Sequence, residues 1–171
     1  MADRNYARDV FVRGLKNAHA MEKQALSIMQ PQLNRLEHYP DMSRRLEEHV
    51  RETETQVDRL DTLLEQLSER NSSLKDASLS AMGSMAAMGH IPAGDEVLKN
   101  SFANLAFENY EIAAYISLIT SGRASGLDVD VNLLEKSLGE ERRMAEWVAD
   151  SIPAVTKTFI SLHGSGETAK R

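Results

Sequence analysis

The chain has 171 residues and 19.1 kDa, so we expect one domain with a buried core. Its net charge is −6, and its 20 Lys and Arg residues are scattered among 26 acidic ones, which argues against nucleic acid or a membrane surface as a partner. No apolar run reaches the ~18 residues of a membrane helix, and the charged N-terminal segment is unlike a signal peptide, so we expect a cytoplasmic protein. Because cysteine is absent, any metal must be held by oxygen and nitrogen, which favours iron or manganese over structural zinc.

Strong helix formers dominate and no stretch alternates like a strand, so the sequence predicts an all-α fold. Pro31 should kink or end the first helix, and Asp41 is a candidate cap for the second. Pro153 should separate the fourth helix from a short apolar C-terminal helix. The main helices are expected at about 3–37, 41–70, 94–123 and 129–150.

The connections between these helices predict how they are arranged. Short turns join the first helix to the second and the third to the fourth, which favours two antiparallel hairpins. The segment 71–93 is long enough to carry the chain along the bundle, and it is expected to hold one shorter helix at 81–88, whose methionines we interpret as packing residues. Two hairpins joined by a long crossover are typical of a ferritin-like four-helix bundle. We expect this bundle to span residues 1–162, with a disordered tail at 163–171.

Each predicted main helix carries an acid or a histidine where a core residue should stand. Glu22 interrupts an apolar stripe with helical spacing, and Glu141 interrupts another. Isolated buried carboxylates cost several kcal/mol unless they are paired or coordinated, so their recurrence points to a bound cation. The candidate metal ligands are Glu22, His49, Glu52, Glu108, Glu111 and Glu141.

The pattern differs from the usual ferritin-like di-metal site, in which two of the helices carry Glu-x-x-His. The count of six ligands matches, but Thr55 and Met144 stand where the two motif histidines would be. His49 instead precedes Glu52 by three residues. Tyr115 and Gln56 each lie one turn beyond an acid and are expected to donate hydrogen bonds to the site.

Several segments carry a further signal. They are Ala20-Met21-Glu22-Lys23-Gln24, the stretches 49–60 and 107–115, Glu140-Glu141-Arg142, and Met-Ala-x-Trp at 144–147. These segments resemble the YciE/YciF bacterial stress-protein family, most closely its YciE branch, and the resemblance extends over about residues 5–162. It implies a ferritin-like homodimer with a dinuclear metal centre and no established reaction, and it supports the acids 22, 52, 111 and 141 as one carboxylate from each helix.

Two functions are compatible with this sequence. The first is a stress-response protein whose dinuclear site holds iron or manganese and oxidises metal or consumes peroxide. The alternative is a non-catalytic scaffold or protein-interaction module, in which the buried acids share protons and hydrogen bonds with Tyr115, Gln56 and His49. The same residues serve either function, so the sequence does not separate the two hypotheses.

Overall fold

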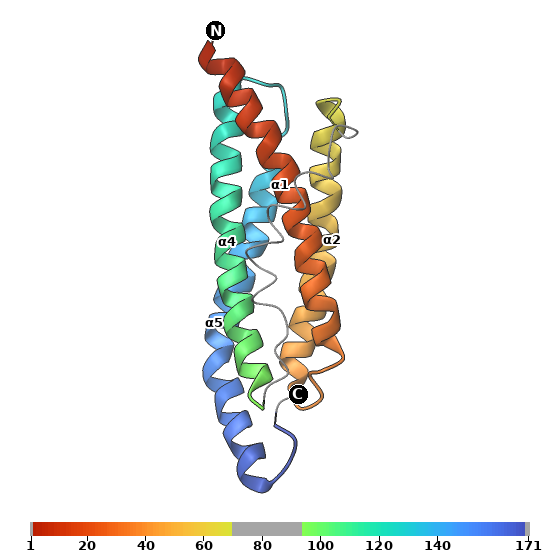
Figure 1. The fold of residues 1–171 in the computed structure, drawn as a ribbon, viewed down its shortest axis with the longest axis vertical. Coiled ribbons are helices and arrows are strands. Elements are labelled where there is room, and N and C mark those ends of the chain that lie inside the picture. Colours follow the sequence, from red (N-terminus) through yellow and green to blue (C-terminus); the bar gives the residue numbers. More distant parts are fainter. Residues whose placement is uncertain (1, 70–93, 170–171) are drawn as a thin grey trace.

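The computed structural model describes residues 2–69 and 94–169, so the helix expected at 81–88 lies outside the described residues. Within them the chain forms no strand and four long helices that lie side by side in one bundle (Figure 1). These helices are α1 (Ala2–Leu33), α2 (Pro40–Gln66), α4 (Glu96–Ser125) and α5 (Asn132–Ser165). The predicted all-α, ferritin-like four-helix bundle is confirmed. None of the described helices combines the length and apolar composition needed to span a membrane.

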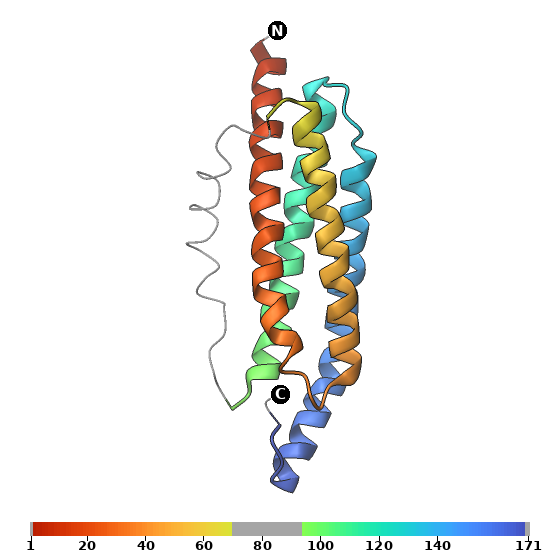
Figure 2. The same cartoon turned by 90° about the vertical axis from the view of Figure 1, so that its right-hand side faces the viewer.

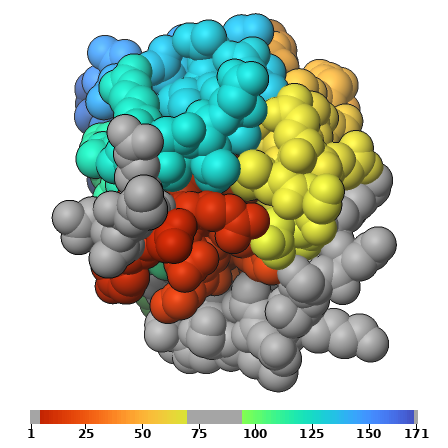
Figure 3. Space-filling view, turned by 90° about the horizontal axis from the view of Figure 1, so that it is seen from above, coloured from red at the N-terminus to blue at the C-terminus, as the bar shows by residue number. Residues whose placement is uncertain are grey.

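The helices pack as two hairpins. α1 contacts α2 and α4, while α5 contacts α4 and α2, and the contact between α2 and α5 is the least extensive of the four. α2 ends at the opposite end of the bundle from the start of α4, as the predicted crossover requires (Figure 2). Figure 3 looks down on the end where α1 begins and α2 finishes. There, Nζ of Lys16 lies 3.0 Å from the carboxylate of Glu69 and ties the two helices together.

The helix ends differ in part from those expected. α1 passes through Pro31 and ends two residues later. Pro40 stands in the first turn of α2, where its missing N–H leaves no helical bond unmade. Asp41 makes no capping hydrogen bond, because its exposed carboxylate pairs with Arg44 instead.

The C-terminal part of the chain is also more helical than expected. α5 continues through Pro153 to Ser165, so no separate C-terminal helix forms. Pro153 is exposed, and Val155, two residues later, is buried in the core, so packing beyond the proline holds the helix together. Beyond α5, the hydroxyl of Tyr39 donates a 2.6 Å hydrogen bond to the carbonyl of Ala169. The structure therefore places residues 163–169, which we had expected to form part of a disordered tail.

The core follows the predicted stripes. Phe11, Leu15 and Leu134 are completely buried, and the ring of Phe11 packs directly against the backbone of Gly122. A Cβ atom added at Gly122 would lie 2.9 Å from Cε2 of that ring, closer than ordinary van der Waals contact. Glycine at position 122 thus allows α1 and α4 to approach closely.

Replacing Gly122 by alanine should therefore lower the free energy of unfolding by ~1–3 kcal/mol, because the buried ring of Phe11 has to move. Gly139→Ala is the matched control, since its added Cβ would make only ordinary contact, 3.4 Å from Arg143, and should raise stability by ~0.5–1 kcal/mol through helix propensity. Urea unfolding followed by circular dichroism measures both changes. Equal effects of the two substitutions would contradict the assignment of a close contact at Gly122.

Candidate metal centre

Each helix directs at least one acid or histidine into the middle of the bundle. Glu22 comes from α1, His49 from α2, Glu108 and Glu111 from α4, and Glu141 from α5, and none of them is more than 2% exposed. Each lies three or four residues from apolar core residues on its own helix, so the helical period that buries those residues buries the polar ones too. The predicted core positions of these five residues are confirmed.

Four of these side chains form one compact cluster. His49, Glu108, Glu111 and Glu141 each offer one atom, and these four atoms all lie within 4.8 Å of one another. When each ligand oxygen lies about 2.1 Å from an ion, two oxygens on opposite sides of it are about 4.2 Å apart. The four side-chain atoms would therefore have to move only slightly closer together to hold a cation. Glu22 lies outside this group of four but is close enough for its charge to act on Glu111.

Several buried polar atoms at this centre lack a hydrogen-bond partner. Nε2 of His49 is 3.2 Å from an oxygen of Glu108 and 3.6 Å from one of Glu141, but neither contact has hydrogen-bond geometry. Unsatisfied buried groups are rare, and each costs roughly 1–3 kcal/mol or more when it carries charge. Among the described residues, the unpartnered buried side-chain atoms are Oε2 of Glu22, Nε2 of His49, Oε1 of Gln56, Oε2 of Glu108, Oε1 of Glu111 and Oε2 of Glu141.

Electrostatics favour extra positive charge here. Burial raises the pKa of Glu22 to about 8, and burial together with neighbouring carboxylates raises the pKa values of Glu111 and Glu141 well above the usual range. Burial lowers the pKa of His49, but its acidic neighbours Glu108 and Glu52 outweigh this effect and raise it to about 10. In the absence of metal, protons therefore partly neutralise the cluster.

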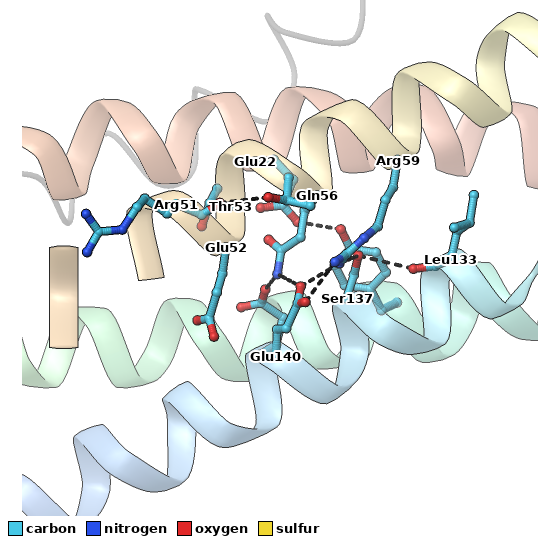
Figure 4. Close-up of polar contacts among 12 residues, drawn as sticks. Glu22, Arg51, Glu52, Thr53, Gln56, Arg59, Leu133, Ser137 and Glu140 are labelled. Carbon is cyan, nitrogen blue, oxygen red and sulfur yellow. Dashed lines mark hydrogen bonds and ion pairs between the residues drawn. The ribbon is translucent and has the colours of Figure 1, made fainter. Parts of the chain in front are cut away.

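Hydrogen bonds from neighbouring side chains hold Glu141 of the cluster and the adjacent Glu22 in place. The hydroxyl of Tyr115 donates to Oε1 of Glu22 over 2.6 Å, and Nε2 of Gln56 donates to Oε1 of Glu141, so the expected donor roles of Tyr115 and Gln56 are confirmed. The same Gln56 nitrogen donates to Glu140 over 3.0 Å (Figure 4). The bonds from Tyr115 and Gln56 fix one oxygen of Glu22 and one of Glu141, and the second oxygen of each acid has no hydrogen-bond partner.

Glu52 does not join the cluster, contrary to the expectation that one acid from each helix would converge. Its side chain is 27% exposed, and one of its oxygens accepts hydrogen bonds from both terminal nitrogens of Arg45, each 3.0 Å long. The same oxygen lies 2.9 Å from Nδ1 of His49. Although burial raises the pKa of Glu52, the hydrogen bonds with His49 and Arg45 outweigh it and hold that pKa below its usual value. Arg45 thus draws this carboxylate to the edge of the site.

Sequence reasoning missed three residues that surround the site. Arg59 binds both oxygens of Glu140, at 2.6 and 2.9 Å, and Glu140 in turn accepts from Gln56 (Figure 4). Arg45 likewise pairs with an acid next to the site, because it donates two hydrogen bonds to Glu52. A sequence signal for the two arginines exists, since positions 45, 52 and 59 are seven residues apart and therefore share one side of α2.

Without metal, the free energy of unfolding should fall as the pH rises from about 5 to about 8. The pKa of Glu22 is 4.5 in an unfolded chain and about 8 in the folded one, so over this interval the folded state retains a proton that the unfolded state has lost. His49 acts in the same direction between 6.5 and about 10. Each such proton lowers the stability by about 1.4 kcal/mol per pH unit.

Glu22→Gln should make this pH dependence shallower and should leave the metal-free protein at least as stable at neutral pH, because a neutral amide replaces a carboxyl that has to take up a proton on folding. Glu54→Gln changes an exposed acid of α2 and should keep the slope of the unmodified chain. Urea unfolding in the presence of a chelator, repeated across the pH range, provides the comparison. Equal slopes for Glu22→Gln and the unmodified chain would contradict the assigned pKa.

Comparisons with known proteins identify the family. The family model described as "Domain of unknown function (DUF892)" matches residues 6–161. Protein YciF of Escherichia coli K12 is 31% identical over 145 residues, which cover 78% of this chain and 82% of YciF. A crystal structure of a protein from Xanthomonas campestris pv. campestris matches with a TM-score of 0.75 and 32% identity, covering 92% of this chain and 99% of that one. The crystal structure of the E. coli stress protein YciF matches with a TM-score of 0.68 and 26% identity, covering 85% and 94%. The chain therefore belongs to the DUF892 family, which includes YciF.

Proposed function

We propose that this protein is a cytoplasmic stress-response protein whose bundle holds a dinuclear centre of iron or manganese. The observation that carries the metal site is the set of six unpartnered buried atoms, which come from all four helices. The stress-response role is taken from the E. coli relative, which is described as a stress protein. A cation held among His49, Glu108, Glu111 and Glu141 would give partners to the unpartnered atoms of these four residues.

The donor set fits hard divalent ions. Carboxylate oxygens with one imidazole nitrogen suit iron and manganese, and the chain has no sulfur ligand of the cysteine type. His49, Glu108, Glu111 and Glu141 would hold one ion. Glu22, which acts electrostatically on Glu111, would supply a further oxygen for the second. Two divalent ions would also offset the charge of the four acids in place of the protons that they hold otherwise.

We further propose that the bound ions react with peroxide or dioxygen. The ions would supply the electrons, and a ligand shell made mostly of carboxylates stabilises the ferric state of iron. The residues of the chain bind the ions, keep water out and fix the ligands, with Tyr115 holding Glu22 and Gln56 holding Glu141. Iron oxidation and retention, or slow peroxide removal with an electron donor, would follow.

One observation favours the alternative function. The bonds from Tyr115 to Glu22 and from Gln56 to Glu141 already satisfy one oxygen of each acid without metal. A scaffold stabilised by such a network would need no ion. The scaffold hypothesis therefore predicts a protein that binds no iron and keeps its buried acids protonated.

We also propose that the protein is a homodimer that uses the outer face of α4. Between Lys99 and Arg123 this helix carries no charged residues except Glu108 and Glu111, both of which are buried. The outer side chains of Phe102, Tyr110 and Ile116 are 52%, 53% and 44% exposed. A helix that is uncharged on its outer face is typical of one that a second surface covers.

The metal hypothesis predicts that the chain binds two equivalents of iron after anaerobic addition of ferrous iron and gel filtration. Adding peroxide should then produce the near-ultraviolet absorbance of ferric iron faster than in buffer. Glu111→Ala and Glu141→Ala should each remove most of the bound iron, because each takes away an oxygen of the cluster. Glu54→Ala removes an exposed acid from α2 and serves as the control, with binding unchanged.

Failure of the unmodified chain to retain iron or manganese would refute the metal site and favour the scaffold. Normal iron binding with oxidation no faster than in buffer would refute only the proposed chemistry. The protein is purified without a chelator, which would remove bound metal, and without a nickel column, which would supply a competing one. The iron or manganese retained by the unmodified chain can then be measured directly.

The dimer hypothesis predicts a mass twice that of the 19.1 kDa chain in light scattering. Ile116→Glu should shift the mass to that of a monomer, since it places a charge in the uncharged outer face of α4, while the helical circular dichroism stays unchanged. Ala149→Glu introduces the same charge at an exposed position of α5 and should leave the dimer intact. A monomer mass for the unmodified chain at all concentrations would contradict the proposal.

A further inference from the structure

A polar seam between α2 and α5 leads from the surface towards the cluster. On α2, Arg45, Glu48, Glu52 and Arg59 lie on one side of the helix, because successive members are three, four and seven residues apart. Arg59 crosses the seam to reach Glu140 on α5. Among the four neighbouring helix pairs, α2 and α5 make the least extensive contact.

At one end the seam widens into a cavity of about 490 Å³. The start of α2 and the part of α5 around Trp147 line it, and its acids are Asp41, Glu48 and Asp150. Asp41 is paired with Arg44, but Glu48 and Asp150 have no ion-pair partner among the described residues. These two free carboxylates give the cavity negative charge that attracts cations.

Arg45 and Glu52 connect this cavity with the cluster. Arg45 lines the cavity and donates two hydrogen bonds to Glu52. Glu52 reaches inward to Nδ1 of His49, and Nε2 of the same ring faces the cluster acids Glu108 and Glu141. Glu52 is therefore partly exposed to solvent on one side and in contact with a cluster residue on the other.

We propose that the cavity admits divalent cations and that Glu52 is the ligand that carries them into the cluster. Glu52 exchanges the guanidinium of Arg45 for the incoming ion and delivers it to His49 and the buried acids. This inference rests on the proposed metal site and deepens it, because Glu52 becomes a transit ligand instead of a resident one. Besides the ionic contacts of Glu52 that are exchanged, the incoming ion displaces the protons held by His49 and the buried acids, which pass to solvent.

The Arg45–Glu52 pair also explains why the carboxylate stays at the edge of the site. A fifth acid among Glu22, Glu108, Glu111 and Glu141 would add repulsion to a centre in which burial already raises carboxyl pKa values. Pairing with Arg45 keeps Glu52 next to the cluster without that repulsion. The ion itself is what makes the inward position favourable, since it brings positive charge with it.

The test compares the rate and the extent of iron uptake. The metal-free protein is mixed rapidly and anaerobically with ferrous iron, the free ion is followed with a ferrous-binding dye, and bound iron is counted at equilibrium. Glu52→Gln should slow uptake on the order of tenfold while leaving the final stoichiometry unchanged. Glu47→Gln alters an exposed acid of the same helix, 60% exposed at its side chain, and should take up iron at the rate of the unmodified chain.

Two further variants separate the steps. Arg45→Gln frees Glu52 and should accelerate uptake. The double variant Glu48→Gln/Asp150→Asn removes the free charges of the cavity and should slow uptake at low ionic strength, with the difference disappearing at high salt. Circular dichroism and thermal unfolding of each variant show whether the fold is kept.

The outcomes distinguish this inference from the function on which it rests. An unmodified chain that binds no iron overturns both the metal site and the transit role. Iron binding by the unmodified chain, with Glu52→Gln equally fast, overturns the transit role alone. A lower stoichiometry in Glu52→Gln without a change of rate also overturns it, because Glu52 would then be a resident ligand.

Discussion

The structure depends on one constraint, which is the presence of four carboxyl groups and one imidazole in the middle of an apolar bundle. Burial alone penalises every charged form, and each carboxylate raises the cost of the next. The centre meets this constraint by retaining protons: burial raises the pKa of Glu22 to about 8, and the surrounding acids raise that of His49 to about 10. A bound cation and a set of bound protons are therefore alternative ways of neutralising the same group of residues.

The surroundings of the centre serve the same constraint. Tyr115 fixes one oxygen of Glu22, and Gln56 fixes one oxygen of Glu141, so these acids are oriented while the second oxygen of each stays unpartnered. Gln56 is itself positioned by Glu140, which Arg59 neutralises. The ion pair of Arg59 and Glu140 thus stands one layer further out, where α2 and α5 face each other, and it positions the Gln56 that holds Glu141.

The contact between α1 and α4 combines close apolar packing with buried hydrogen bonds such as the one from Tyr115 to Glu22. α1 and α4 pack closely, with the ring of Phe11 against Gly122, whereas α2 and α5 meet through ion pairs and a cavity. The packing of Phe11 against Gly122 fixes α1 and α4 relative to each other, while the cavity lies between the start of α2 and the part of α5 around Trp147.

The helical period by itself determined the four long helices and the burial of Glu22, His49, Glu108, Glu111 and Glu141, because each shares a face with apolar residues of its own helix. The family resemblance and the ferritin-like connectivity were also readable from the sequence. The position of Glu52 was not, since its place at the edge of the core stripe allowed either orientation. Only the folded structure placed its carboxylate at the edge of the site, where one oxygen contacts both His49 and Arg45. Likewise, the sequence predicts a helix end at Pro153, whereas in the structure α5 continues and Val155 is buried in the core. Packing between the helices outweighs the local preference of proline to end a helix.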